Sequence, residues 1–229
     1  MPKALLEVIA LDAVDARHAA AGGADRVELV SDIHLLGLTP TVETFTAVRA
    51  ETDLPIRVML RQQDGFAAGN LDSLRRSIDA LRAAGADEFV LGFLDADGRV
   101  DLASLRAVQA MIDGCAWTFH KALDHATDRQ AAWRAIDGLP GLDAVLTSGG
   151  PFGVAEGHDA LIAEAKSQAL RIVAGGALRE HHLAPLLDGG VDAFHTGVAV
   201  RAHTSWDSPV DEGKVRRWRE RLGAGVPVQ

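Results

Sequence analysis

The stretch AGGADRVEL, residues 21–29, recurs in altered form as AAGADEFVLG at 83–92 and as DGGVDAFHTG at 188–197. In each copy, glycine follows the last apolar turn of a helical segment, a position where glycine commonly ends a helix. An acidic residue and a short apolar segment come next. The repeated pattern therefore predicts three joints, each leading from the end of a helix into a buried strand.

Five further apolar runs bring the number of predicted strands to eight: LLEVIA (5–10), IRVMLR (56–61), AWTFHKA (116–122), AVLTSG (144–149) and RIVAGG (171–176). Segments rich in Ala and Leu, with helical period, separate them. Strands that alternate with helices favour right-handed crossovers and a parallel sheet. The sequence therefore predicts an α/β fold, a single (β/α)8 TIM barrel over residues 1–229. The alternative, an open doubly wound sheet, usually has a Gly-rich phosphate turn after its first strand, which this sequence lacks.

The composition restricts the classes of partner. A net charge of −9 argues against a broad nucleic-acid surface, which needs clustered Lys and Arg. No apolar stretch reaches the roughly 20 residues that cross a bilayer, and the N-terminus lacks the pattern of a signal peptide. The single cysteine, Cys115, excludes an internal disulfide framework. We therefore expect a cytoplasmic protein with no nucleic-acid or membrane partner, and the sequence leaves open whether it forms a homo-oligomer.

The candidate catalytic residues are Glu7, Glu28, His120 and His195. Ligands and catalytic groups of TIM barrels collect at the C-terminal ends of the strands, and side-chain alternation directs these four toward that end of the barrel interior. A buried carboxylate is costly without a partner, and Arg61, at the end of the third strand, is the nearest partner in kind. We predict that all five converge at one mouth. A purely structural network of Glu and Arg explains the same residues equally well.

The stretch WTFHKALDH, residues 117–125, carries polar groups from the fifth strand into this mouth. Thr118 and His120 share parity and are expected to point inward. Lys121 then points outward to the helix layer, which disfavours Schiff-base chemistry. Asp124 precedes a helical run and is interpreted as its N-terminal cap.

A candidate anion site lies after the seventh strand. Gly175 and Gly176 allow a tight turn that can bring backbone N–H groups to a helix N-terminus, where an anion is favoured, and barrels often hold phosphate at this place. With Arg61, these glycines make up the predicted anion-binding residues, and a small-molecule anion is the predicted partner. A plain turn explains the two glycines equally well.

The ordered combination of several motifs resembles the copper homeostasis protein CutC family. The motifs are LLEVIALD, GGADRVELV, LGLTPT, GFLDADGRVD, TFHKALD, LTSGG, VAGGALREHHL and FHTG, which together span roughly residues 5 to 200. The resemblance implies a cytoplasmic TIM barrel with a polar site at the strand ends, and the family's polar positions match Glu7, Glu28, His120, Asp124 and His195. It also implies a role in copper tolerance, with copper as the only suggested cofactor.

Two departures from the family pattern concern the ligand site. The family's third strand typically ends in Arg-Pro-Arg-Gly-Gly, of which only Arg61 remains, and the cysteines common after the first two strands are missing. We therefore predict no metal-binding residues. Three functions stay open: copper homeostasis by binding or trafficking the metal, an enzyme acting on a small anionic or phosphorylated metabolite, and a scaffold whose polar mouth is structural.

Overall fold

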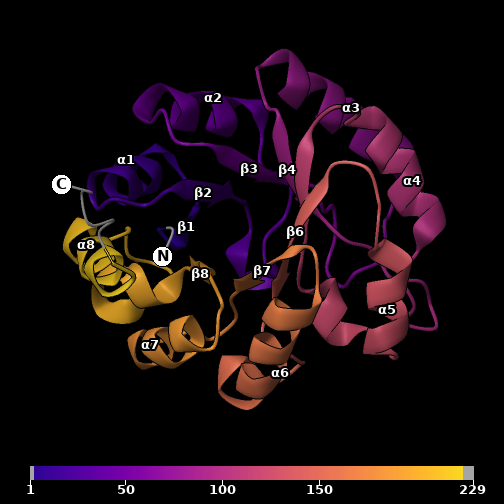
Figure 1. Cartoon of the computed structure of the whole chain (residues 1–229). Helices are drawn as coiled ribbons and strands as arrows, with labels where there is room; N and C mark the ends of the chain where they lie inside the picture. Colours follow the sequence, from indigo (N-terminus) through magenta and orange to yellow (C-terminus); the bar gives the residue numbers. More distant parts are fainter. Residues whose placement is uncertain (1–2, 224–229) are drawn as a thin grey trace.

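The computed structural model describes residues 3–223, and its strands form a closed barrel in chain order, β1 to β8, with every neighbouring pair parallel. The predicted (β/α)8 fold is confirmed. Figure 1 shows the strands at the centre and the helices around them. The strands are β1 (Leu5–Ala10), β2 (Arg26–Leu29), β3 (Ile56–Met59), β4 (Glu88–Leu91), β5 (Ala116–Phe119), β6 (Leu142–Thr147), β7 (Arg171–Ala174) and β8 (Ala193–Thr196).

One α-helix follows each strand. Most of these helices begin after an Asp, Asn or Thr whose side chain accepts a hydrogen bond from a backbone N–H of the first turn, which satisfies a group that the helix itself leaves unpaired. The helices are α1 (Ala13–Ala21), α2 (Val42–Glu51), α3 (Leu71–Ala83), α4 (Leu102–Met111), α5 (Arg129–Ile136), α6 (Val154–Ser167), α7 (Glu180–Asp188) and α8 (Glu212–Arg221).

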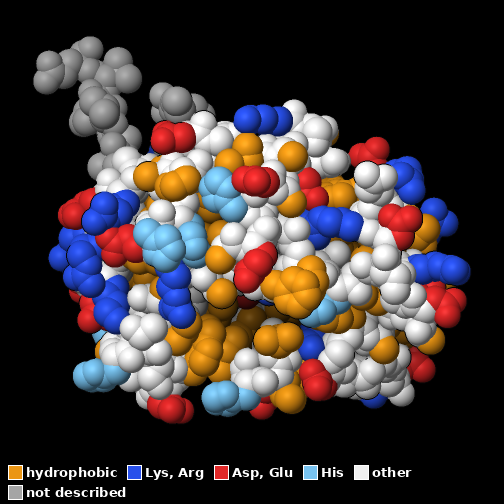
Figure 2. Space-filling view, turned by 90° about the horizontal axis from the view of Figure 1, so that it is seen from below, with side chains coloured by type: hydrophobic (Ala, Val, Ile, Leu, Met, Phe, Trp, Pro, Cys, Tyr) orange, Lys and Arg blue, Asp and Glu red, His pale blue; other side chains and the backbone are white. Residues whose placement is uncertain are grey.

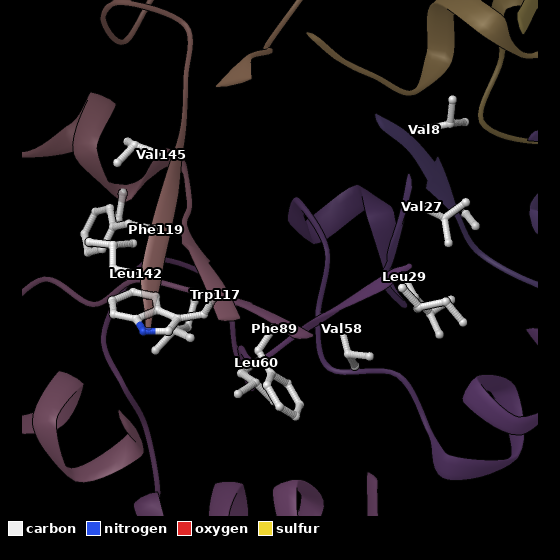
Figure 3. Packing of buried hydrophobic residues seen from close by; sticks show 14 of the residues in the cluster. Val8, Val27, Leu29, Val58, Leu60, Phe89, Trp117, Phe119, Leu142 and Val145 are labelled. Atoms are coloured by element: carbon white, nitrogen blue, oxygen red, sulfur yellow. The ribbon is translucent and has the colours of Figure 1, made fainter. Parts of the chain in front are cut away.

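The main hydrophobic core lies between the strands and the helices. One side-chain parity of the strands faces this layer, as Val8, Val27, Val58, Phe89 and Trp117 do in Figure 3. Burying such side chains contributes about 1.5–3 kcal/mol each. The side chains of the other parity therefore point into the barrel and fill its interior.

The inside of the barrel combines small apolar clusters with charged residues. Apolar side chains fill part of it in two groups: Ile9, Val30, Met59 and Val90, and Ala144, Leu146, Val173 and Ala193. The parallel register sets Glu7 beside Arg26 on β2 and beside His195 on β8. Charged groups that are far apart in the sequence therefore meet in the barrel centre.

The surface shows both signs of charge. On the face seen in Figure 2, acidic and basic side chains are interspersed, with no single-sign patch over it. Within residues 3–223, none of the helices is both long and apolar enough to cross a bilayer.

Candidate functional site

A cavity of about 260 Å³ lies at the C-terminal ends of the strands. Five of the predicted site residues line it: Glu28, Arg61, His120, Gly176 and His195. The rest of its wall is mostly apolar and comes from strand ends and the loops that follow them, including Ile9, Ile33, Leu36, Met59, Phe66, Leu146, Leu178, Val198 and Trp206. The structure thus brings five of the seven predicted site residues to one mouth, and Glu7 and Gly175 do not line it.

Glu7 lies fully buried and is held on both sides. Its Oε2 accepts from Arg26 Nε at 2.5 Å, and its Oε1 lies 2.8 Å from His195 Nδ1. Burial alone would raise the pKa of Glu7, but the charge of Arg26 and the hydrogen bond from His195 lower it well below its usual range. Since a carboxylate only accepts, His195 Nδ1 must donate the proton of this bond. Glu7 therefore fixes the orientation of the imidazole.

Glu28 is the second carboxyl of this centre and is less well satisfied. Its Oε2 lies 3.7 Å from His195 Nε2, and its buried Oε1 has no hydrogen-bond partner in the part of the chain that the structure describes. Burial raises the pKa of Glu28 to about 7, although His195 opposes this shift. For His195, burial lowers the pKa, and the charges of Glu28 and Glu7 outweigh that effect and raise it. Glu28 thus titrates near neutral pH, beside an imidazole whose pKa is raised.

His120 is held as a neutral imidazole. Its Nδ1 accepts from the backbone N–H of Ala122 at 3.2 Å, so the proton of the neutral ring is on Nε2. Burial lowers the pKa of His120 to about 3, and the charge of Arg61 adds to this. His120 Nε2 has no partner within the described chain and belongs to a cavity-lining residue. His120 thus offers a hydrogen-bond donor that stays neutral.

Arg61 does not pair with either glutamate, which corrects the expectation that it is their partner; that role belongs to Arg26 and His195. Arg61 Nε donates to the carbonyl of Gly65 at 2.8 Å, and Nη1 donates to the carbonyls of Gly37 and Leu35. Its Nη2 has no hydrogen-bond partner, and the nearest carboxylate oxygen, on exposed Asp64, lies 3.6 Å away. The strand ends at Met59, so Arg61 lies above the glutamates and fixes the loops around the cavity.

Lys121 lines the cavity, so the expectation that it points outward is wrong. A short 3-10 helix, Lys121–His125, starts directly after His120 and ends the alternation of the strand. Lys121 Nζ lies over Gly176, where a Cβ atom would approach it to 2.6 Å. Lys121 makes no salt bridge with any residue of the described chain. The direction of the Lys121 side chain therefore no longer argues against Schiff-base chemistry.

Asp124 is not the cap of the following helix, as the sequence suggested. The cap of α5 is Asp128, whose side chain accepts from the N–H of Ala131. Asp124 instead joins the turn after β5 to the end of β6 by accepting from Ser148 N, Ser148 Oγ, Thr147 Oγ1 and Arg129 Nη1. The carboxylate thus holds the turn that carries Lys121.

The two glycines after β7 have different positions. Gly176, with φ of +98°, lines the cavity, and the absence of a side chain leaves room for Lys121. Gly175 packs against His195 instead: a Cβ atom there would come within 3.0 Å of His195 Cβ and within 2.6 Å of Leu146 Cδ1. Helix α7 begins only at Glu180, so four residues separate Gly175 from its first turn.

Three residues of the site were missed in the sequence: Arg26, Lys121 and Thr196. Thr196 Oγ1 is buried without a hydrogen-bond partner and lies at the end of β8, where Thr196 lines the cavity. Arg26 shares the parity of Glu28 within RVEL, and this alternation could have identified it. The sequence holds no comparable signal for Lys121, because it lies beyond the last strand residue.

A metal site is poorly supported by the donor atoms. Glu7, Glu28 and His195 each place one ligand atom within 4.8 Å of the others. Both oxygens of Glu7, however, are already paired with Arg26 and His195. We interpret this trio as an ion-pair network.

The fold and the cavity define a (β/α)8 barrel with a polar centre that reaches its C-terminal mouth. The chain belongs to the CutC family, whose model matches residues 4–200. A CutC family protein of Caulobacter vibrioides is 36% identical over 213 residues, which cover 91% of this chain and 83% of that protein. The human copper homeostasis protein cutC homolog is 31% identical over 198 residues, or 83% of this chain and 72% of that protein.

Solved structures show the same fold. The crystal structure of a copper homeostasis protein CutC from Streptococcus agalactiae matches with a TM-score of 0.77 and 21% identity, covering 85% of this chain and 98% of that one. A thiamine phosphate pyrophosphorylase from Pyrococcus furiosus matches with a TM-score of 0.61 and 19% identity, covering 96% and 97%. At these identities the likeness concerns the fold alone.

Proposed function

We propose that this CutC family protein acts in copper homeostasis in the cytoplasm, and that its barrel mouth binds a small organic anion. The names of its relatives support the first part. The second part rests on one observation: four buried polar atoms that find no hydrogen-bond partner among residues 3–223 belong to residues that line a single cavity. They are Glu28 Oε1, Arg61 Nη2, His120 Nε2 and Thr196 Oγ1.

Leaving a buried polar atom unpaired costs about 1–3 kcal/mol. Four such atoms in one cavity are difficult to explain by stability, because native structures pair most of their buried polar groups. A ligand with several oxygen atoms would pair with them. This combination of convergent polar groups and a mainly apolar wall is typical of small-molecule sites.

The charges of the wall favour an anion. Arg61 and Lys121 are the two cations of the lining, and Glu28 is its single carboxyl group. Arginine and lysine bind carboxylate or phosphate through charge-assisted hydrogen bonds. At about 260 Å³ the cavity is below the usual range of about 300–1,000 Å³ for ligand pockets, so the ligand is small.

Loss of Lys121 or of Arg61 should weaken anion binding by more than about tenfold, the effect of removing a charge-assisted bond of about 1.5–3 kcal/mol. The measurement is calorimetric titration of Lys121→Met and Arg61→Ala with four probes: inorganic phosphate, oxalate, pyruvate and dihydroxyacetone phosphate. Lys121→Met is the cleaner variant, since Arg61→Ala also removes hydrogen bonds to three loop carbonyls.

Arg171→Met is the matched control, because Arg171 lies at the exposed start of β7 and pairs with Asp192 at 3.2 Å. It should leave the dissociation constants unchanged. If the wild-type protein binds none of the four probes, the anion site is wrong. If binding persists unchanged in Lys121→Met, the lysine has no part in it.

Copper(I) fits the donor atoms of the cavity poorly. Cu(I) prefers thiolate and thioether ligands, and the cavity offers one sulfur, that of Met59. Cys115 is buried beside the start of β5, at the opposite end of the strands from the mouth. Burial also raises the pKa of its thiol, which disfavours the thiolate. We therefore propose that copper is not stored tightly in this barrel.

Purified protein is expected to lose its copper after anaerobic Cu(I) loading followed by competition with a strong chelator. Any metal that remains should be a weakly held divalent ion near the imidazole and carboxylate groups of the mouth. Elemental analysis of wild type, Met59→Leu and Cys115→Ala decides the matter. One tightly retained copper per chain, lost in either variant, would contradict the prediction.

A further inference from the structure

Acid–base groups and hydrogen-bond donors enter the cavity from different strands. The acid–base side consists of Glu28 on β2, with Glu7 on β1 and His195 on β8 behind it, and these three strands are neighbours in the barrel. The donor side consists of Arg61 after β3 and His120 after β5. Each side presents to the cavity a residue with a buried atom that no protein group satisfies.

We propose that the cavity catalyses proton transfer at the carbon next to the carbonyl group of a small anionic carbonyl compound, with Glu28 as the catalytic acid–base residue. This inference rests on the anion site proposed above and names the reaction and the substrate class of that site.

Glu28 has the position and environment of a general base. Glu28 lines the cavity, its Oε1 has no hydrogen-bond partner among the described residues, and its Oε2 lies 3.7 Å from His195 Nε2. The groups that act on it are Glu7 of β1, His195 of β8, Arg26 of its own strand and Arg57 of β3, and burial opposes its charged form most strongly. A carboxyl that titrates near neutral pH can take a proton and return it in the same cycle. Glu28 therefore acts first as the base that removes the proton and then as the acid that returns it.

Glu7 and His195 are positioning residues. Both Glu7 oxygens are paired, and the bond to His195 Nδ1 directs His195 Nε2 toward Glu28. The imidazole is thus held in a fixed orientation with its Nε2 3.7 Å from Glu28 Oε2. A fixed tautomer and orientation of this kind keep a base aligned during turnover.

His120 and Arg61 supply donors where negative charge would develop. Phe66 lies beside both, with its ring centroid 5.5 Å from the His120 ring and 5.4 Å from Arg61 Cζ. Because the neutral His120 imidazole carries its proton on Nε2, this N–H group can donate a hydrogen bond to an oxyanion. Preorganised donors in a cavity with apolar walls stabilise an enolate far better than water does.

The step balances without an oxidant, a reductant or a second substrate. Glu28 takes the proton of the C–H bond, the electron pair of that bond forms a C=C bond, and the carbonyl oxygen becomes an enolate oxygen held by His120 Nε2–H and Arg61 Nη2–H. Glu28 then returns the proton to the same carbon, the electron pair of the C=C bond forms the new C–H bond, and the carbonyl group is restored. The anionic group of the substrate is held by Lys121.

Solvent exchange tests the inference directly. Pyruvate and dihydroxyacetone phosphate are incubated with the protein in D₂O, and proton NMR follows the loss of the signals next to the carbonyl. Wild-type protein is expected to catalyse this exchange for at least one of the two probes. Glu28→Gln should slow it by about 100-fold or more, the range of general acid–base catalysis, while the dissociation constant of the probe changes by less than about threefold.

Glu220→Gln is the matched control, because Glu220 is exposed near the end of α8, away from the mouth. It should exchange like the wild type. The wild-type rate should also fall as the pH drops below about 7, since Glu28 must be deprotonated to act as a base. A rate that does not depend on pH across this range would contradict the assignment of Glu28.

Failure of the two proposals can be told apart. Calorimetric binding of a probe without any exchange overturns the proton transfer and leaves the anion site standing. Absence of binding overturns both. If borohydride traps a covalent adduct with either probe, and Lys121→Met abolishes both the adduct and the exchange, the reaction passes through an imine at Lys121 and the role of Glu28 as the primary catalytic group is wrong.

Discussion

Replacing Arg26 by Met is expected to lower the free energy of unfolding by about 3–5 kcal/mol, the usual cost of leaving one member of a buried ion pair without its partner. Arg26 donates to Glu7 at 2.5 Å, and Glu7 is 1% exposed. Methionine preserves much of the length of the side chain, so the lost charge dominates the effect. Urea denaturation at about pH 7 measures it.

The double variant Glu7→Gln/Arg26→Met should recover most of this loss, because it removes both charges and keeps an acceptor for His195. Arg17→Met provides the control: Arg17 pairs with Glu51 on the surface, and such pairs contribute at most about 1 kcal/mol. Equal losses of unfolding free energy in Arg26→Met and Arg17→Met would show that the buried Arg26–Glu7 pair stabilises the fold no more than a surface pair does.

The pH should modulate the effect of Arg26→Met. Folding lowers the pKa of the Glu7 carboxyl from its ordinary value of 4.5, so the stabilisation is complete above that value and is lost as the pH falls toward the folded pKa. The difference in the free energy of unfolding between wild type and Arg26→Met is therefore expected to be smaller at about pH 3 than at about pH 7. A difference in unfolding free energy that grows as the pH falls would contradict this account.

The second large effect concerns Asp124. Asp124→Ala should also cost about 3–5 kcal/mol, because a buried carboxylate that accepts from Ser148, Thr147 and Arg129 is removed and their donors are left unpaired. Thermal and urea unfolding of the variant measure the loss. Binding of the anion probes should weaken as well, since the same turn carries His120 and Lys121.

Asp128→Ala is the informative comparison for Asp124. Asp128 lies four residues further on and only caps α5, so its loss should cost about 1 kcal/mol. A larger loss for Asp128→Ala than for Asp124→Ala would reverse the roles that the structure gives to these two residues.

The fold could be predicted because its strongest signal repeats. Each joint from glycine through an acidic residue into a short apolar strand encodes the same local structure, and strands that alternate with helices in this way favour parallel pairing. Alternation along the strands also directed Glu28, His120 and His195 to the cavity at one mouth, while Glu7 lies buried beside His195 and does not line that cavity. Both signals depend on residues that lie close together in the chain.

The partners within the site could not be predicted, because they depend on register and on where strands end. Arg26 lies at the start of β2 and Glu7 in the middle of β1, and only the parallel register sets them side by side. Lys121 was assigned the wrong side because alternation was extended two residues beyond Phe119, the last residue of β5. Asp124 and Asp128 look equivalent in sequence, and only the first residue of α5 decides which one is the cap.

The bond between Glu7 and His195 joins the first strand of the barrel to the last, across 188 positions of the chain. During synthesis, domains fold as units while the chain grows from its N-terminus. Glu7 is made early, whereas His195 follows only when β8, the last strand of the ring, has been synthesised. Completion of the network of Glu7, Arg26 and His195 is thus tied to completion of the barrel, because a chain that ends before His195 cannot form the contact with Glu7.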